Sequence, residues 1–302
     1  MTTSKNTQLV DVADLDVIFL TYDEPKKDEY WIKLKNMVPW AQRVDGVTGS
    51  DAAHKAAAGA SSTDRFVVVD GDNIPDPEFF NLQLSLDDTN RDCVFRWRAR
   101  NVVNGLMYGN GGISCWTKKF VNEMQTHEAS DGTPATAVEF CFYPNYWAMS
   151  DCYSTTYPNA TPYQAWRAGF REGVKMCLDR GTKPSLYEFK QRVHSRNLDN
   201  LSIWHNIGQD ADNGTWAIYG ARLGTYLTML TDWRYQQVQD FGQLDAIWQA
   251  YKDKDADYYV EIADALRTRL DLPVLDLDAE QSAFFKHHYK SNFTNKGIMT
   301  RE

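Results

Sequence analysis

Two aspartates separated by a single glycine are the residues of this chain best suited to hold a metal ion. The segment Asp70-Gly-Asp-Asn follows three consecutive valines. Residues two apart in an extended chain point to the same side, so the carboxylates of Asp70 and Asp72 can face one ion. Carboxylate oxygens are hard ligands that suit Mg²⁺ or Mn²⁺. The spacing predicts a divalent-metal site, and a simple Asp-Gly turn is the alternative.

The strands and helices needed to position this pair alternate along the N-terminal part of the chain. Short apolar, β-rich runs predict strands, and spaced apolar or alanine-rich runs predict helices. We expect strands at residues 16–21, 41–47 and 65–70, and helices at residues 29–37 and 50–60. The third strand is continuously apolar, which is typical of a parallel strand covered on both faces. In such α/β folds ligands bind beyond the carboxyl ends of the strands, which is where Asp70 and Asp72 lie.

The rest of the chain changes character twice. Residues 93–142 contain glycine-punctuated short strands, with turns expected at Asn104-Gly105 and at residues 109–112. Further on, helices are expected at residues 163–178, 184–193, 220–230, 244–252 and 256–270. We therefore expect a core at residues 1–159 and a mainly helical region at residues 160–302.

Composition excludes several classes of protein. The formal net charge of −9 argues against a dedicated reader of duplex DNA, although it is compatible with a local basic patch. The five cysteines include no Cys-x-x-Cys pair, which favours free thiols in the cytoplasm over disulfides or a zinc site. No apolar run reaches the length of a membrane span, and the polar start does not resemble a signal peptide. A P-loop motif is absent, and no Gly-x-Gly-x-x-Gly follows the first strand, which disfavours kinase and dinucleotide functions.

The order of a Thr21-Tyr-Asp loop, Asp45 and Asp70-Gly-Asp72 resembles the GT-A fold nucleotide-sugar glycosyltransferases. The resemblance covers roughly residues 16–80 and implies an α/β, Rossmann-like mixed sheet flanked by helices. In that family the Asp-x-Asp carboxylates coordinate Mn²⁺ or Mg²⁺ on the sugar nucleotide, here Asp70 and Asp72. The loops after the first two strands hold the base and ribose. The nucleotide-sugar site implied by position comprises Thr21, Tyr22, Asp23, Asp45, His54, Lys55, Asp70, Gly111 and Gly112.

A second, narrower resemblance lies between residues 95 and 116. This segment is similar to the phage and kinetoplastid glycosyltransferases that act on hydroxymethylated pyrimidines in DNA, the relatives of the base J glucosyltransferase. It implies transfer of a hexose, glucose from UDP-glucose, onto hydroxymethyluracil or hydroxymethylcytosine, in the host cytoplasm if the chain is phage-encoded. Residues 109–112 offer backbone N–H groups and room for a close-packed ligand. The expected acceptor-binding residues are Arg96, Arg98, Arg100, Asn104, Tyr108, Trp116, Arg167 and Arg171.

Three further residues complete the expected site. Some GT-A enzymes supply a later histidine to the metal, and His205 is the candidate here, with a hydrogen-bonded core histidine as the alternative. Because base J carries a β-linked glucose, the resemblance implies inversion, which needs a general base for the acceptor hydroxyl. Asp151 is the first candidate for that base and Glu139 the second.

Other functions stay open at this stage. A GT-A enzyme with a non-DNA acceptor would use the same donor site. A nucleotidyltransferase of the same fold would need a glycine-rich, lysine-bearing loop after the first strand, and the loop at residues 22–27 has no glycine. A carbohydrate-binding or structural phage protein would use Asp70 and Asp72 only as a turn. The sequence leaves open the sugar, the stereochemical outcome and the oligomeric state.

Overall fold

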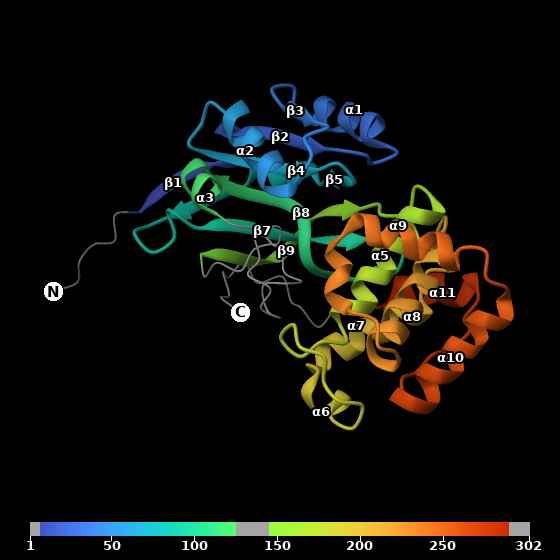
Figure 1. The fold of residues 1–302 in the computed structure, drawn as a ribbon. Helices are drawn as coiled ribbons and strands as arrows, with labels where there is room; N and C mark the ends of the chain where they lie inside the picture. The colour runs from blue at the N-terminus through green and yellow to red at the C-terminus, as the bar shows by residue number, and fades with distance from the viewer. Residues whose placement is uncertain (1–6, 125–144, 290–302) are drawn as a thin grey trace.

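The computed structural model describes residues 7–124 and 145–289, and its central feature is a seven-stranded mixed sheet (Figure 1). The strand order is β3-β2-β4-β8-β7-β9-β5. The expected alternation of strands and helices is confirmed in the N-terminal part, where β2 pairs in parallel with both β3 and β4. These elements are β2 (Asp16–Thr21), α1 (Lys27–Met37), β3 (Gln42–Asp45), α2 (Ser50–Ala60) and β4 (Arg65–Asp70).

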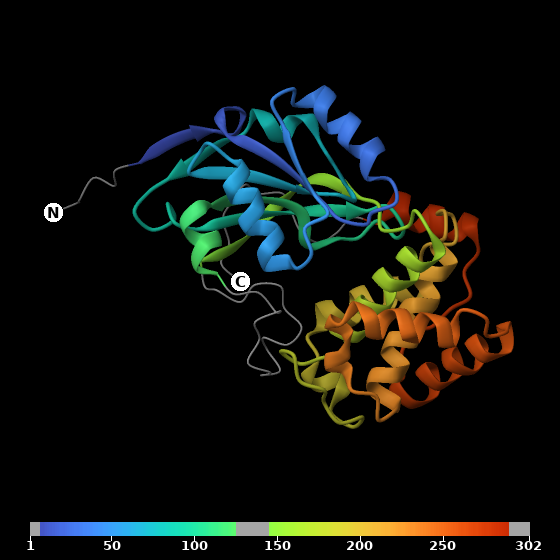
Figure 2. The same ribbon diagram turned by 45° about the horizontal axis from the view of Figure 1, so that its top comes forward.

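Strand β4 is covered on both faces, as its unbroken apolar sequence predicted. Val67 and Val69 face the cluster that contains Leu34 of α1, whereas Val68 faces the cluster that contains Ala57 of α2. Figure 2 shows α1 and α2 on opposite sides of the sheet. Because both layers hold β4 in place, the residues at its carboxyl end have a defined position.

The second half of the sheet corrects one expectation. Residues 93–117 form one long hairpin whose turn contains Asn104 and Gly105, as expected, but residues 109–112 lie inside a strand. Gly112 has a φ of +74°, and the register of β8 against β7 shifts between the pairs Trp97–Ile113 and Ala99–Tyr108. The glycines therefore occupy an irregularity inside the strand and not a turn that ends it. The strands here are β5 (Asn73–Pro75), β7 (Val94–Asn101), β8 (Met107–Thr117) and β9 (Tyr146–Thr156).

Smaller elements border the sheet. Strands β1 (Gln8–Asp11) and β6 (Gln83–Leu86) form a separate antiparallel pair. Helix α3 (Lys118–Glu123) follows β8, with the hydroxyl of Thr117 accepting the backbone N–H of Phe120 at its start. Among the described residues, no helix combines the length and the apolar character that crossing a membrane requires.

Helices dominate from residue 162 to residue 288 and gather beside the sheet (Figure 1). The boundary expected near residue 159 lies in the connection between β9 and the first of these helices. The helix expected at 184–193 is reduced to one turn, and two helices at 195–206 and 279–288 were not expected. The helices are α5 (Pro162–Lys175), α6 (Phe189–Arg192), α7 (Ser195–Asn206), α8 (Gly214–Leu230), α9 (Phe241–Tyr251), α10 (Ala256–Leu270) and α11 (Ala279–His288).

Helices α5 and α8 pack backbone against backbone through glycines. A Cβ added at Gly169 would lie 1.9 Å from the carbonyl oxygen of Ala217, and one at Gly220 would lie 2.1 Å from that of Trp166. Gly173 and Gly224 repeat the contact one turn further on. This close approach fixes one face of α5 against α8. Residues two positions before Gly169 and Gly173 point about 200° away around the helix, and they are both arginines.

Candidate functional site

Three carboxylates meet at the carboxyl end of β4. Asp70 and Asp72 flank Gly71, as the sequence predicted, and Glu24 lies over that glycine. A Cβ at Gly71 would lie 2.6 Å from Oε2 of Glu24, so a larger residue would collide with the carboxylate. The backbone N–H of Tyr22 donates to the same oxygen at 2.8 Å. Glu24 was not expected from the sequence, because it reaches Gly71 only when the loop after β2 folds back.

The charges of neighbouring carboxylates contribute to the raised pKa of Asp70 and to that of Glu24. Although Asp70 is accessible to solvent, the surrounding protein displaces enough water to raise its pKa, and the charges of Asp72 and Glu24 add to the effect, giving about 8. Burial likewise raises the pKa of Asp72 and that of Glu24. A divalent cation bound to Asp70 and Asp72 would offset the charge that raises the pKa of Asp70 and would displace protons. The donor set, oxygen only, fits Mg²⁺ or Mn²⁺.

Asp72 is held by a buried amide. Asn73 is 3% exposed, and its Nδ2 donates to Oδ1 of Asp72 at 2.7 Å. The hydroxyl of Ser154, on β9, donates to Oδ1 of Asn73 at 3.1 Å, which fixes which side of the amide faces Asp72. Gly112 on β8 makes room, since a Cβ there would lie 2.1 Å from Nδ2 of Asn73. Residues from three strands therefore orient one carboxylate.

His205 does not join this group, which corrects the expectation that it is a metal ligand. It lies on α7 with no solvent exposure, and its Nε2 is 2.9 Å from the hydroxyl oxygen of Thr225. Burial, followed by the charge of Arg222, lowers its pKa to about 3. In the part of the chain that the structure describes, no three His, Cys, Asp or Glu side chains are arranged to hold a metal ion. A metal at Asp70 and Asp72 would thus take its other ligands from substrate and water.

The residues expected to hold the nucleotide come together on one flank of the carboxylates. The hydroxyl of Thr21 donates to Oδ1 of Asp45 at 2.8 Å, and Nζ of Lys27 donates to the same oxygen at 2.7 Å. The hydrogen bond from Lys27 is the main reason that the pKa of Asp45 is lowered. Tyr22, 49% exposed, and Asp23, also exposed, extend from this cluster into solvent.

Several other expected site residues are packed in the interior instead. His54 stacks edge-on against Trp116, with ring centroids 5.0 Å apart, while its neighbour Lys55 is exposed on α2. Trp116 is 1% exposed and belongs to the core between α2 and α3, so it does not face an acceptor. Asn104 is fully buried and accepts the N–H of Leu106 in the hairpin turn. Hydrophobic packing explains why His54 and Trp116 are buried. Gly111, which has no side chain, lies within β8 and could offer only its backbone groups to a ligand.

The arginines of β7 differ in their surroundings. Arg96 lies over the ring of Tyr146 at 5.2 Å, Arg98 is 8% exposed, and Arg100 is open to solvent. Arg100 is therefore the member of this set most accessible to a phosphate. Tyr108 lies elsewhere, since its hydroxyl donates to Glu172 and accepts Nε1–H of Trp204 at 2.7 Å. Tyr108 connects the sheet to the helices.

Arg167 approaches the carboxylates from α5, and Arg171 lies four residues further along the same helix. The positive charge of Arg167 opposes the rise in the pKa of Asp72. Both guanidinium groups lie over the ring of Phe241, with Cζ 5.0 Å and 5.6 Å from its centroid. Phe241 was not expected from the sequence, because only the packing of α9 on α5 brings it next to these arginines.

Of the two candidates for a general base, Asp151 lies away from the carboxylate cluster. Asp151 lies in β9 just before Cys152, and Thr156 at the end of that strand hydrogen-bonds to Asp72. Cys152 and Thr156 pair with residues three apart on β7, a separation of about 10 Å. Asp151 is further away still, outside hydrogen-bond reach of a group held at Asp72. Glu139 lies outside the described residues.

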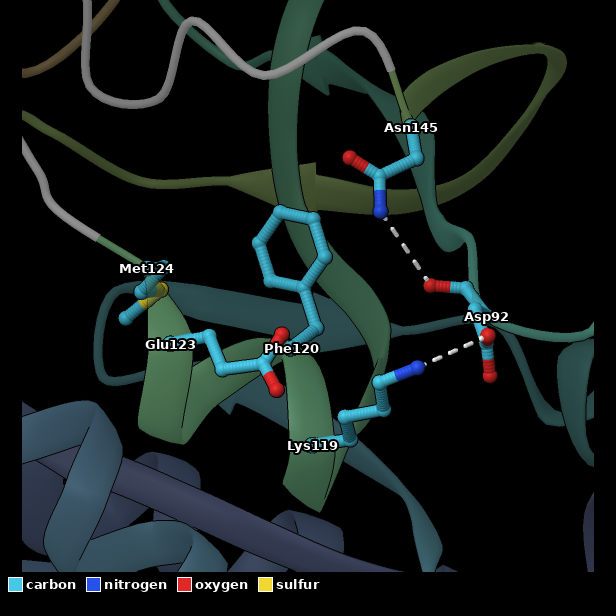
Figure 3. A pocket seen from close by; sticks show the side chains of 6 residues that line it. All are labelled: Asp92, Lys119, Phe120, Glu123, Met124 and Asn145. Atoms are coloured by element: carbon cyan, nitrogen blue, oxygen red, sulfur yellow. Dashed lines mark hydrogen bonds and ion pairs between the residues drawn. The ribbon is translucent and has the colours of Figure 1, made fainter.

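Two cavities lie away from this cluster. One, of about 140 Å³, is shown in Figure 3, where Nζ of Lys119 is 3.2 Å from Oδ2 of Asp92 and Asn145 donates to the carbonyl of Asp92. The other, of about 310 Å³, lies between α8 and α10 beside Arg222 and Arg267, whose guanidinium groups both pair with Asp276. In each cavity, ion pairs or hydrogen bonds join some of the polar lining groups to one another.

No protein-family model matches this chain, and no curated protein matches it significantly.

Proposed function

We propose that this chain is a metal-dependent GT-A glycosyltransferase of the cytoplasm. It moves a hexose, glucose from UDP-glucose, onto the hydroxymethyl group of a modified pyrimidine in DNA. The observation that carries the proposal is the convergence of Asp70, Asp72 and Glu24 at the carboxyl end of the parallel strand β4. That edge is where α/β sheets bind nucleotides. A bound divalent cation would neutralise the negative charge of the carboxylates there.

The flanks of the cluster support a nucleotide diphosphate sugar as the ligand. Asp70 and Asp72 would hold a divalent ion that supplies positive charge to the departing diphosphate. Asn73 keeps Asp72 in one orientation. Thr21 and Asp45, joined by a hydrogen bond, form the side on which the ribose and base would lie. The positive charge of Arg167 is close enough to lower the pKa of Asp72, so it offsets part of the negative charge of the cluster.

The transfer itself exchanges one bond to the anomeric carbon for another. The acceptor hydroxyl oxygen attacks that carbon, and the bond to the diphosphate oxygen breaks with its electron pair leaving on the nucleoside diphosphate. The hydroxyl proton passes to a base, for which Glu139 stays a prediction. With inversion as proposed, attack and departure occur on opposite faces of the sugar.

A donor-hydrolysis assay tests this function. UDP-glucose, UDP-galactose, UDP-N-acetylglucosamine and GDP-mannose are each incubated with the protein and Mn²⁺, with and without hydroxymethylated DNA, and released nucleotide is measured. We expect release from UDP-glucose that needs the metal, increases with the DNA and is lost in Asp72→Ala. The matched control is Asp253→Asn, which changes an exposed aspartate on the helical side.

The other outcomes separate the alternatives. If the release of nucleotide does not depend on the DNA, the glycosyltransferase activity stands and the proposal of a DNA acceptor is wrong. A nucleotidyltransferase would instead join a sugar 1-phosphate to the α-phosphate of a nucleoside triphosphate and release pyrophosphate. Pyrophosphate formed from UTP and glucose 1-phosphate, with no nucleoside diphosphate released from the sugar nucleotides, would therefore indicate that activity. If no donor is cleaved and none raises the melting temperature with Mn²⁺, the enzymatic proposal is wrong and a binding or structural role takes its place.

A further inference from the structure

Two neighbouring arginines on α5 have no acidic partner among the described residues. Within residues 7–124 and 145–289, no carboxylate forms an ion pair with Arg167 or Arg171. The nearby carboxylates are engaged elsewhere: Glu172 with Tyr108 and Lys175, and Asp245 with Tyr163. The two arginines are four residues apart and share one face of the helix. Two close cations that no ion pair joins to a carboxylate form a surface that attracts an anion.

The environment of Arg171 strengthens this attraction. Burial lowers the pKa of its guanidinium, the charge of Glu172 opposes part of that change, and the charge of Arg167 adds to it. Arg171 is not fully covered, because part of its surface stays accessible. An anion that reaches it would meet a cation already stripped of much of its water, where electrostatic attraction is stronger than in bulk solvent. Planar guanidinium groups match the oxygens of a phosphate in a two-point contact.

An aromatic ring completes the surface. Phe241 is 48% exposed, and the guanidinium carbons of Arg167 and Arg171 lie 5.0 Å and 5.6 Å from its ring centroid. The ring is held in place because it begins α9, whose cap Asp240 accepts the N–H of Gly242 at 2.8 Å. Exposed aromatic rings beside cations bind nucleobases by stacking and phosphates by charge. The pairing therefore fits one nucleotide unit.

The position of this surface indicates which nucleotide it takes. Strand β3, which carries Asp45, is one edge of the sheet, and β5, which follows Asp72, is the other. The cluster of Thr21 and Asp45 lies on the β3 side of the carboxylates, and α5 approaches Asp72 through Arg167. If the donor nucleotide lies at Asp45, the arginine side is left for the acceptor.

We propose that Arg167, Arg171 and Phe241 bind one nucleotide of the acceptor strand, with its phosphate on the two arginines and a base stacked on the phenyl ring. This inference rests on the proposed function, since it needs a nucleic acid acceptor. It adds a binding platform that places the strand beside the sugar held at Asp72. The overall charge of −9 makes such a local platform necessary, because the chain as a whole repels polyanions.

The test is a binding titration of the full chain with a fluorescent oligonucleotide that contains hydroxymethyluracil, as a single strand and as a duplex. Phe241→Ala and Arg171→Gln should each weaken binding by about tenfold. Arg171→Gln should also reduce the slope of log K against log salt by about 1. Arg171→Lys, which keeps the charge, should restore the slope but only part of the affinity.

Two control variants carry the same chemistry elsewhere. Phe284 is a 65% exposed ring on α11, and Lys254 lies over the ring of Tyr258 at 5.3 Å. Phe284→Ala and Lys254→Gln should leave DNA affinity unchanged. All variants are also titrated with UDP and Mn²⁺ by thermal shift, and the donor-side shift should equal that of the unaltered protein in every case.

The outcomes distinguish this inference from the proposed function. If the unaltered chain binds the oligonucleotide and Phe241→Ala and Arg171→Gln bind it equally well, the platform is wrong and the function stands. If those variants lose UDP binding, the arginines belong to the donor site and the inference is overturned. If the unaltered chain cleaves UDP-glucose but binds no oligonucleotide, the DNA acceptor and the platform both fall.

Discussion

Replacing Gly112 with alanine should disable the metal site through Asn73. Gly112 has a φ of +74°, and a Cβ there would lie 2.1 Å from Nδ2 of Asn73. The amide would have to move, and it would lose its 2.7 Å hydrogen bond to Asp72. Asp72 would then keep its hydrogen bond to Thr156 but lose the one from Asn73, so its orientation toward the ion would be less fixed. Supporting hydrogen bonds of this kind are worth about 10–100-fold in metal affinity.

The cost in stability has two separable parts. The left-handed backbone conformation costs an alanine about 1–2 kcal/mol, and loss of a hydrogen bond to a charged group adds about 1.5–3 kcal/mol. Gly46 provides the matched control, since it has the same φ of +74° but nothing within 4 Å of an added Cβ. Gly46→Ala should therefore show the backbone cost alone. Gly112→Ala should lower the free energy of unfolding by about 3–5 kcal/mol.

Urea denaturation measures the stability difference, and electron paramagnetic resonance of Mn²⁺ measures metal affinity in the absence of nucleotide. The double variant Asn73→Ala/Gly112→Ala removes the clash, so it should be less destabilised than the sum of the two single variants. The reasoning is refuted if Gly112→Ala matches Gly46→Ala in both stability and Mn²⁺ affinity. Additive effects in the double variant would also contradict it.

Three further predictions concern the helical part and its link to the sheet. Gly169→Ala should destabilise the fold by at least about 3 kcal/mol in urea denaturation, because an added Cβ would lie 1.9 Å from a backbone carbonyl oxygen of α8. The control is Gly59→Ala, in open space on α2, which should be neutral or stabilising by up to about 1 kcal/mol. Burial lowers the pKa of His205 to about 3, so the unfolded chain binds the extra proton below about pH 6.5 and stability should fall as the pH drops from there towards 3. His205→Gln should flatten that pH dependence and leave Mn²⁺ affinity unchanged, and a loss of Mn²⁺ affinity would restore His205 as a ligand. Tyr108→Phe should lower the free energy of unfolding by about 1–3 kcal/mol, because Glu172 and Trp204 both lose their partner; an unchanged urea midpoint would contradict this link between sheet and helices.

Local sequence predicted the elements on which the site is built. The strand at residues 65–70 and the helix at residues 50–60 have the expected bounds, because a continuous apolar run and an alanine-rich run each favour one structure over any other. The place of Asp70 and Asp72 at the carboxyl end of β4 follows from the same pattern. Local sequence misled at residues 109–112, where glycines typical of turns lie within a strand.

Tertiary structure decided which side chains surround those two aspartates. Glu24 reaches Gly71, Ser154 reaches Asn73, and Phe241 reaches Arg167 across long separations in the chain. Trp116 and His205, by contrast, have chemistry suited to a site but are packed inside. The sequence by itself determined where two carboxylates stand on one strand, because strand periodicity is local. The partners, the charge and the accessibility of those carboxylates were decided only by the packing of β8, β9, α5 and α9 around them, since contacts between distant segments leave no periodic signal in a single chain.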